Sequence, residues 1–291
     1  MAPSSRDDDA SAAPFDAAPW LEACRAASTE LREVLARRPT TVERAEETGA
    51  RGGGGDRTLV IDQQAEAAVF AGLDALHARG HRFTAVSEER GEVFYGDGDL
   101  RVVIDPIDGS LNAKRDLPHH AMSIAVADGP TMADVVFGYV YDYGPGEEWV
   151  ACRGAGATVD GRRLDPGLSE RRVSDGRLEV LGLESADPRW VAEVATELVA
   201  RAHRLRALGA IAVSLCQVAA ARFDAMVSLK PCRSFDAAAA QLIVREAGGH
   251  VSFPACATPL GAPLDLEPRS PVVAARSARA LAELVSLPPG S

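Results

Sequence analysis

The chain has 291 residues, of which 46% are hydrophobic and 25% are charged, a composition typical of a water-soluble globular protein. This length suffices for one large domain or for two closely packed ones. The formal net charge of −11 argues against nucleic acid or an anionic membrane as a partner, because both require a basic protein surface.

The cysteines and the N-terminus indicate the compartment. The five cysteines are scattered without a CxxC pair, which is typical of a reducing compartment and argues against a structural zinc site. Residues 1–15 are small, polar and acidic, so we expect a disordered tail and no signal peptide. No apolar run reaches the roughly 18 residues that a membrane span needs. The sequence therefore predicts a soluble, cytoplasmic protein.

The first part of the chain predicts two helices. Residues 20–37 repeat apolar side chains at helical spacing, and Pro39 follows them. The glycines at 52–55 favour a mobile loop, since no helix begins on them. Asp62 then occupies the position expected of a helix N-cap, and good helix formers follow it. Taken alone, Asp62 is best interpreted as that cap.

A short strand is predicted over residues 82–86, and it leads into Glu88 and Glu89. Adjacent acids after a strand are usually solvated loop charges. Considered separately from the rest of the chain, Glu88 is therefore a weak candidate for function.

The most informative stretch is residues 102–112, VVIDPIDGSLN. A buried strand is predicted to end at Asp105, and ligand sites gather at the carboxyl ends of strands. Pro106 stiffens the loop that follows, and Gly109 permits a backbone conformation that other residues resist.

A short helix is predicted to start at Ser110, where free backbone N–H groups would suit a phosphate. The alternative is a hairpin turn, since Asp-Pro and Asp-Gly both favour turns. Residues 111–118 lack the alternation of a returning strand, so the helix is favoured.

The remainder alternates strands and helices irregularly, with a polar connection at about residues 165–176 that divides an N-terminal lobe (16–165) from a C-terminal lobe (166–291). Residues 154–158 resemble part of a dinucleotide fingerprint, but no helix follows, which excludes a Rossmann fold. Asp236 is either a second N-cap or something more, and Gly248 ends its helix. The predicted strands are 121–127, 135–141, 148–152, 178–183, 205–208, 223–229 and 271–275; the predicted helices are 188–202, 209–218, 236–247 and 277–287.

Together, these acids and glycines resemble the signature of the inositol monophosphatase family. That signature is an upstream Asp, a Glu-Glu pair, DPxDG followed by Thr or Ser, Trp-Asp, and a helix ending in Gly-Gly. The corresponding residues here are Asp62, Glu88, Glu89, Asp105, Pro106, Ile107, Asp108, Gly109, Ser110, Phe235, Asp236, Gly248 and Gly249. The resemblance implies a layered α/β/α/β/α sandwich of two packed lobes. It also implies a lithium-sensitive, magnesium-dependent phosphatase that forms a homodimer.

The resemblance further implies two to three Mg²⁺ ions in each site. Mg²⁺ prefers carboxylates, water and phosphate oxygens as ligands, and it can polarise a phosphoryl group and activate water. The implied ligands are Glu88, Asp105, Ile107 (through its carbonyl), Asp108 and Asp236. The implied catalytic residues are Asp62, Glu88 and Ser110, which would orient or activate the attacking water.

The implied substrate-binding residues are Asp108, Gly109, Ser110, Gly209, Ala210, Ile211, Lys230, Arg233 and Asp236. Two departures from the family pattern are mild: Ser110 keeps the hydroxyl of the commoner Thr, and Phe235 keeps an apolar support in place of Trp. A third is larger, because the substrate-binding Glu of the animal enzymes corresponds here to Ser228 or Leu229.

Instead, this segment carries Lys230 and Arg233, which resembles the archaeal-type members that hydrolyse both fructose-1,6-bisphosphate and inositol phosphates. A cation there would suit a second phosphate on the substrate. The alternative is that both are surface charges or pair with nearby acids. Lys114 and Arg115 allow the same two interpretations.

The sequence thus predicts a Mg²⁺-dependent phosphomonoesterase acting on a small sugar or polyol phosphate. Inositol-1-phosphate, fructose-1,6-bisphosphate and histidinol phosphate all stay open as substrates, and 3′-phosphoadenosine 5′-phosphate is least favoured. A second hypothesis is a non-catalytic regulator that binds a metal or a phosphorylated metabolite. A third is a structural protein whose acids only cap helices and solvate turns.

Overall fold

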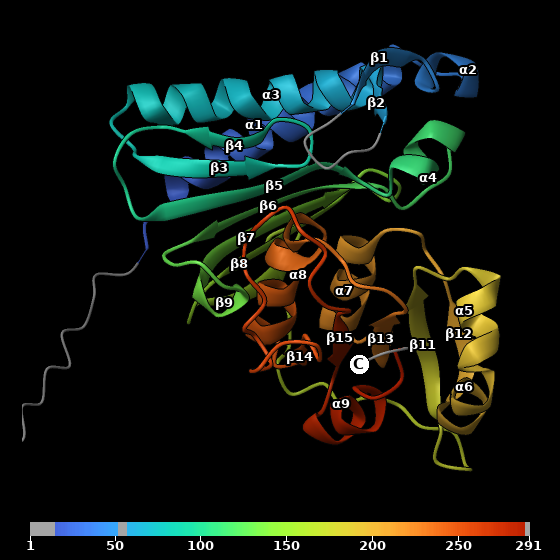
Figure 1. Ribbon diagram of the computed structural model, residues 1–291. Coiled ribbons are helices and arrows are strands. Elements are labelled where there is room, and N and C mark those ends of the chain that lie inside the picture. Colours follow the sequence, from blue (N-terminus) through green and yellow to red (C-terminus); the bar gives the residue numbers. More distant parts are fainter. Residues whose placement is uncertain (1–14, 52–56, 289–291) are drawn as a thin grey trace, which may run out of the picture.

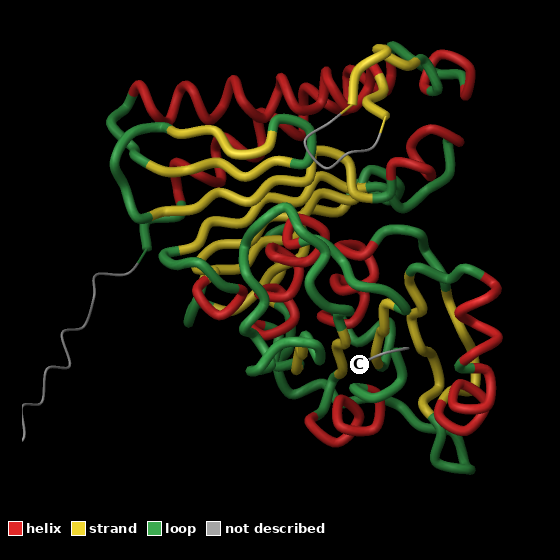
Figure 2. The backbone as a smooth tube through the Cα atoms, in the orientation of Figure 1, coloured by secondary structure: helices red, strands yellow, loops and turns green. Residues whose placement is uncertain are grey.

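The computed structural model describes residues 15–51 and 57–288. Two β-sheets are stacked with helices between them and on both outer faces, which confirms the predicted α/β/α/β/α sandwich (Figure 1). The strands of the two sheets are separate blocks in Figure 2. Within the described ranges, no helix is long and apolar enough to cross a membrane. The predictions for residues 1–14 and 52–55 lie outside the described residues.

Helices α1 (Ala18–Ala36) and α3 (Val60–Ala78) form the outer layer on the large sheet (Figure 1). They pack against each other and bury residues such as Leu31 and Val69 against Ile104 of the sheet. The short elements beside them are α2 (Thr41–Arg44) and the antiparallel pair β1 (Glu47–Arg51) and β2 (Arg57–Leu59).

The large sheet has eight strands in the order β10-β9-β8-β7-β6-β5-β3-β4. Only β3 and β5 are parallel neighbours, so the other pairings are antiparallel. The strands are β3 (Phe83–Ser87), β4 (Gly91–Phe94), β5 (Leu100–Asp108), β6 (Ala121–Ala127), β7 (Val135–Asp142), β8 (Glu147–Cys152), β9 (Gly156–Val159) and β10 (Arg162–Arg163). Helix α4 (Ser110–Arg115) follows β5, and the 3₁₀ turn η1 (Met132–Asp134) precedes β7.

The middle layer consists of α7 (Ile211–Ala219) and α8 (Ser234–Glu246), which lie between the two sheets (Figure 1). Small residues let α8 approach the large sheet closely. A Cβ at Gly138 of β7 would come within 2.6 Å of the Ala239 carbonyl oxygen, so only glycine fits there. This close packing fixes the start of α8, and with it Asp236, against the end of β5.

The small sheet has the order β12-β11-β13-β15-β14, in which β11 is parallel to both of its neighbours. Its strands are β11 (Leu178–Glu184), β12 (Ala202–Arg206), β13 (Ala225–Ser228), β14 (His250–Ser252) and β15 (Val273–Ala275). The outer layer on this sheet is formed by α5 (Pro188–Glu193), α6 (Ala195–Arg201) and α9 (Ala278–Leu284).

Two predicted boundaries are wrong. The helix predicted through residue 202 is two short helices that break at Val194, and the strand predicted at 205–208 is β12, which begins at Ala202. Ala202 pairs with Leu178 of β11, so sheet pairing ends the helix there. Apolar spacing over so few residues does not distinguish a short helix from an edge strand.

Candidate active site

Asp105 and Asp108 come from the same strand, β5, and a bulge brings them together. In a regular strand, residues three apart point to opposite faces. Asp105 pairs with Ser123 of β6 whereas Asp108 pairs with Ala121, so β5 carries one extra residue between them. Pro106 cannot donate to the ladder and suits this irregular position. Each carboxylate is buried, and the charge of Asp108 helps to raise the pKa of Asp105.

Asp62 and Asp236 occupy equivalent positions, each being the third residue of a helix. The Asp62 Oδ2 accepts the Leu59 N–H at 3.1 Å, and the Asp236 Oδ2 accepts the Arg233 N–H at 2.8 Å. The prediction that Asp62 is the N-cap is therefore wrong: Leu59 holds that position, because α3 starts earlier and buries Ile61. Likewise, Arg233 and not Asp236 is the N-cap of α8. The Asp62 Oδ1 is buried and has no hydrogen-bond partner within residues 15–51 and 57–288.

Glu88 lies in the turn between β3 and β4 and is half-buried. Its Oε1 lies 3.3 Å from the Nη1 of Arg233. This ion pair joins the β3–β4 turn to the start of α8. The acids predicted from the sequence thus reach one region from four elements: α3, the β3–β4 turn, β5 and α8.

Burial raises the pKa of every acid in this group, and repulsion from neighbouring acids adds to the rise for Asp62, Glu88, Asp105 and Asp108. Burial raises the pKa of Asp62 to about 7 and that of Asp236 to about 6. The pKa of Glu88 rises to about 8, first through burial and then through the charge of Asp236. Burial also places the pKa values of Asp105 and Asp108 well above the usual range. A divalent cation would reverse these shifts, because it favours the charged carboxylates.

Each of these carboxylates accepts a hydrogen bond from the backbone or, for Glu88, pairs with Arg233. Among the described residues, no three Asp, Glu, His or Cys side chains are arranged as a finished metal site. The Ile107 carbonyl, an expected ligand, accepts the Ser110 hydroxyl at 2.9 Å, so that hydroxyl is not bonded to Asp62 or Glu88. The donor set nevertheless fits Mg²⁺, since it consists of buried and half-buried carboxylate oxygens, including the Asp62 Oδ1, for which the described part of the chain offers no hydrogen-bond partner.

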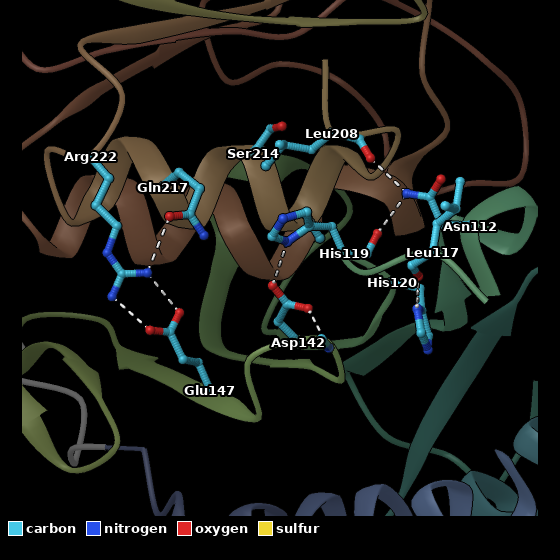
Figure 3. Close-up of polar contacts among 12 residues, drawn as sticks. Asn112, Leu117, His119, His120, Asp142, Glu147, Leu208, Ser214, Gln217 and Arg222 are labelled. Atoms are coloured by element: carbon cyan, nitrogen blue, oxygen red, sulfur yellow. Dashed lines mark hydrogen bonds and ion pairs between the residues drawn. The ribbon is translucent and has the colours of Figure 1, made fainter. Parts of the chain in front are cut away.

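The segment 209–212 contacts Asp108 at the end of β5. The Ile211 and Ala212 N–H groups donate to the two oxygens of Asp108, at 3.2 and 2.7 Å. Gly109 has a φ of 83°, and a Cβ there would come within 3.1 Å of the Gly209 carbonyl oxygen. Asn112 donates its amide to the carbonyls of His119 and Leu208 and so ties α4 to this segment (Figure 3).

Glu184, at the end of β11, is a site residue that the sequence interpretation missed. Its carboxylate accepts the Leu208 and Gly209 N–H groups and the Ser214 hydroxyl, and it lies in the same cavity wall as Asp108. Burial raises its pKa. The sequence contains a signal for Glu184, because this acid follows a predicted apolar strand in the same way as Asp105.

Two adjoining cavities, of about 370 and 310 Å³, share Ser185, Ile211 and Asp236 in their walls. Lys230 and Arg233 line the larger one. The Lys230 ammonium lies 4.8 Å from the centre of the Trp190 ring, whereas Arg233 faces Glu88. Lys114 and Arg115 line neither of these two cavities. The charge of Lys114 nevertheless offsets a small part of the rise in the pKa of Asp62.

Residues 16–287 match the model of the inositol monophosphatase family. The chain is 33% identical over 238 residues to the Nus factor SuhB of Escherichia coli K12, covering 80% of this chain and 85% of the relative. It is 31% identical over 235 residues to a fructose-1,6-bisphosphatase/inositol-1-monophosphatase of Archaeoglobus fulgidus, covering 80% and 83%.

Solved structures show the same fold. The extragenic suppressor protein SuhB of Bartonella henselae matches with a TM-score of 0.74 and 26% identity, covering 94% of this chain and 99% of that one. A protein of Pyrococcus horikoshii, described as similar to inositol-1 monophosphatase, matches with a TM-score of 0.76 and 22% identity, covering 94% and 99%.

The family match and the relative from Archaeoglobus fulgidus support a phosphatase of a class that is generally metal-dependent. More specifically, the chain belongs to the inositol monophosphatase family, which confirms the resemblance found in its sequence motifs.

Proposed function

We propose that this protein is a Mg²⁺-dependent phosphomonoesterase that hydrolyses a small sugar or polyol phosphate. The observation that carries the proposal is the gathering of Asp62, Glu88, Asp105, Asp108 and Asp236, whose pKa values are all raised by burial. Strongly perturbed carboxylates beside a cavity are typical of functional sites.

Two to three Mg²⁺ ions would be held by Glu88, Asp105, Asp108, Asp236 and the Ile107 carbonyl. When bound, they supply charge stabilisation for the phosphoryl group and lower the pKa of water. Asp62 is suited to accept the proton of the attacking water, since its buried Oδ1 has no hydrogen-bond partner among the residues that the structure describes. Ser110 would help to orient that water. These roles follow the family resemblance.

The substrate would occupy the cavities beside Asp108 and Asp236. Gly209 and Ile211 line the smaller cavity, and the family resemblance adds Ala210, Gly109 and Ser110 to the expected binding residues. Lys230 and Arg233 line the larger cavity, which supports a substrate with a second anionic group. Fructose-1,6-bisphosphate fits this arrangement, and inositol-1-phosphate and histidinol phosphate stay as alternatives within the same chemistry.

The test is phosphate release from about ten sugar, polyol and amino-alcohol phosphates, with Mg²⁺, with chelator, and with Li⁺ added to Mg²⁺. We expect release that requires Mg²⁺ and falls when Li⁺ is added. Hydrolysis that continues in the presence of excess chelator would exclude the metal-dependent mechanism.

A second candidate is a non-catalytic regulator that binds a metal or a phosphorylated metabolite. The observation that favours it is that one of the similar curated proteins is named a Nus factor. The same screen separates the two functions: tight binding of a metabolite without any phosphate release would favour the regulator.

Arg233→Ala is expected to reduce kcat/KM for a bisphosphate by about tenfold more than for a monophosphate. The reason is that a hydrogen bond to a charged group contributes about 1.5–3 kcal/mol, and only the bisphosphate would use it. Steady-state kinetics on the substrate pair provide the measurement. Arg279→Ala is the control, because Arg279 is exposed on α9 and pairs with Glu283. An equal loss for both substrates would show that Arg233 serves Glu88 and not the substrate.

The cellular compartment and the oligomeric state are also proposals. All five cysteines are free thiols, which supports a reducing compartment and thus the cytoplasm. We further propose a homodimer, as the family resemblance implies. Sedimentation of the purified chain would test the oligomeric state.

A further inference from the structure

Glu66 is a buried acid of α3 that neither lines the cavities nor was singled out by the sequence motifs. It lies one helical turn after Asp62, so both carboxylates leave the same face of α3. Its side chain points to the turn between β3 and β4, the turn that carries Glu88 and Glu89.

The Glu66 carboxylate holds both ends of that turn. Its Oε1 accepts the Ser87 hydroxyl before Glu88 and the Arg90 N–H after Glu89, the latter at 3.0 Å. Its Oε2 accepts the Arg90 Nε at 3.2 Å. The Arg90 guanidinium also lies 4.1 Å from the ring centre of Phe70, one further turn along α3.

The turn needs such an anchor because its acids face other acids. The charges of Asp236, Glu89 and Asp62 all act against ionised Glu88. Arg233, which reaches Glu88 from α8, is the opposing cation in this interaction. These charges disfavour an ionised carboxylate at this position, so a fixed turn is needed to hold Glu88 beside the other acids.

We propose that Glu66 is a positioning residue that holds the Ser87–Arg90 turn. Held in this way, Glu88 faces the other acids of the site and is preorganised to bind a metal. The inference rests on the proposed function, and it concerns the support of one ligand. Partners that orient metal ligands typically change metal affinity by about 10- to 100-fold when removed.

The same helix offers a matched control. Asp74 lies two turns beyond Glu66 and accepts the Tyr95 hydroxyl at 2.7 Å, so it also ties α3 to the end of β4. This tie lies away from Glu88. Asp74→Ala should therefore lower stability without changing metal affinity.

The experiment measures Mn²⁺ binding to the full chain by electron paramagnetic resonance of the free ion, together with thermal unfolding. Glu66→Ala is expected to weaken the tightest Mn²⁺ binding by about tenfold or more, and Asp74→Ala to leave it within about twofold. In a Glu88→Gln background, Glu66→Ala should cause no further loss beyond about twofold, because its effect passes through Glu88. Glu66→Gln keeps one acceptor oxygen and should lie between wild type and Glu66→Ala. It carries the comparison if Glu66→Ala does not fold.

Two results would overturn the proposal: wild-type Mn²⁺ affinity in the Glu66 variants, or an equal loss with and without Glu88. Either result leaves the proposed phosphatase function intact, since wild-type protein would still bind the ion. If the wild-type chain itself binds no Mn²⁺, the proposed function fails and the positioning role fails with it.

Discussion

Replacing Asp105 with Asn is expected to lower phosphate release by at least about 10³-fold and, at the same time, to stabilise the metal-free protein. A factor of 10³ corresponds to about 4 kcal/mol, which lies within the several kcal/mol that metal charge stabilisation supplies. Asp105 lies close to Glu88, Asp108 and Asp236, the other expected side-chain ligands, so its loss disturbs the whole site. Asn has nearly the same shape and can keep the 3.0 Å bond from the Ile107 N–H to Oδ1.

The gain in stability has a separate cause. Asp105 is 2% exposed, and its charge is opposed first by burial and then by Glu88, Asp108 and Asp236. A neutral side chain removes this repulsion. We therefore expect a higher unfolding temperature in chelator and a smaller increase when Mg²⁺ is added.

Phosphate-release kinetics and thermal unfolding with and without Mg²⁺ check both parts. Asp142→Asn is the control, because Asp142 is a buried acid on β7 that pairs with His119 and lies outside the expected ligand set (Figure 3). It should leave the stabilisation by Mg²⁺ unchanged. Asp105→Asn protein that is both active and less stable would contradict the proposed site.

The metal-free protein is expected to lose stability as the pH rises from about 5 to about 8. The pKa values in the folded state are about 6 for Asp236, about 7 for Asp62 and about 8 for Glu88. In the unfolded chain these groups titrate near pH 4. The folded state therefore binds more protons, so this contribution to stability is fully present below pH 4 and disappears as the pH passes through the folded-state values.

The expected change is a fall of roughly 15 °C or more in unfolding temperature, since one pKa unit corresponds to about 1.4 kcal/mol and three groups contribute. Mg²⁺ should reduce the fall, because it favours the ionised carboxylates. Calorimetry between pH 5 and 8.5, in chelator and in Mg²⁺, gives the measurement, and Asp105→Asn should flatten the curve in chelator. Identical curves in chelator and Mg²⁺ would be incompatible with a metal bound by these acids.

Several features follow from local sequence alone. The apolar run before Asp105 predicted β5, the residues after Gly109 predicted a helix start, and Gly248 predicted the end of α8, where its φ is 81°. Each depends on the conformational preference or the burial pattern of neighbouring residues. The order of the acids along the chain was likewise enough to predict the family.

Other features required the whole chain. Asp62 was predicted as an N-cap, yet α3 starts earlier, at Val60, and the Asp62 Oδ1 has no hydrogen-bond partner among the described residues. The β12 boundary depended on pairing with β11, which local periodicity does not contain. Glu66 and Glu184 acquired their places through contacts with residues that lie about 20 or more positions away.

The sequence by itself determined which residues are expected to carry the chemistry: the acids at strand and helix starts or ends, and the glycines that let the backbone turn beside them. Only the tertiary structure decided that these acids lie in one region. The bulge in β5 turns Asp105 and Asp108 to one side, and the packing of α8 between the sheets brings Asp236 to them. The physical reason is that a carboxylate's pKa and its capacity to hold a cation depend on the charges and the burial around it, and distant parts of the chain supply both.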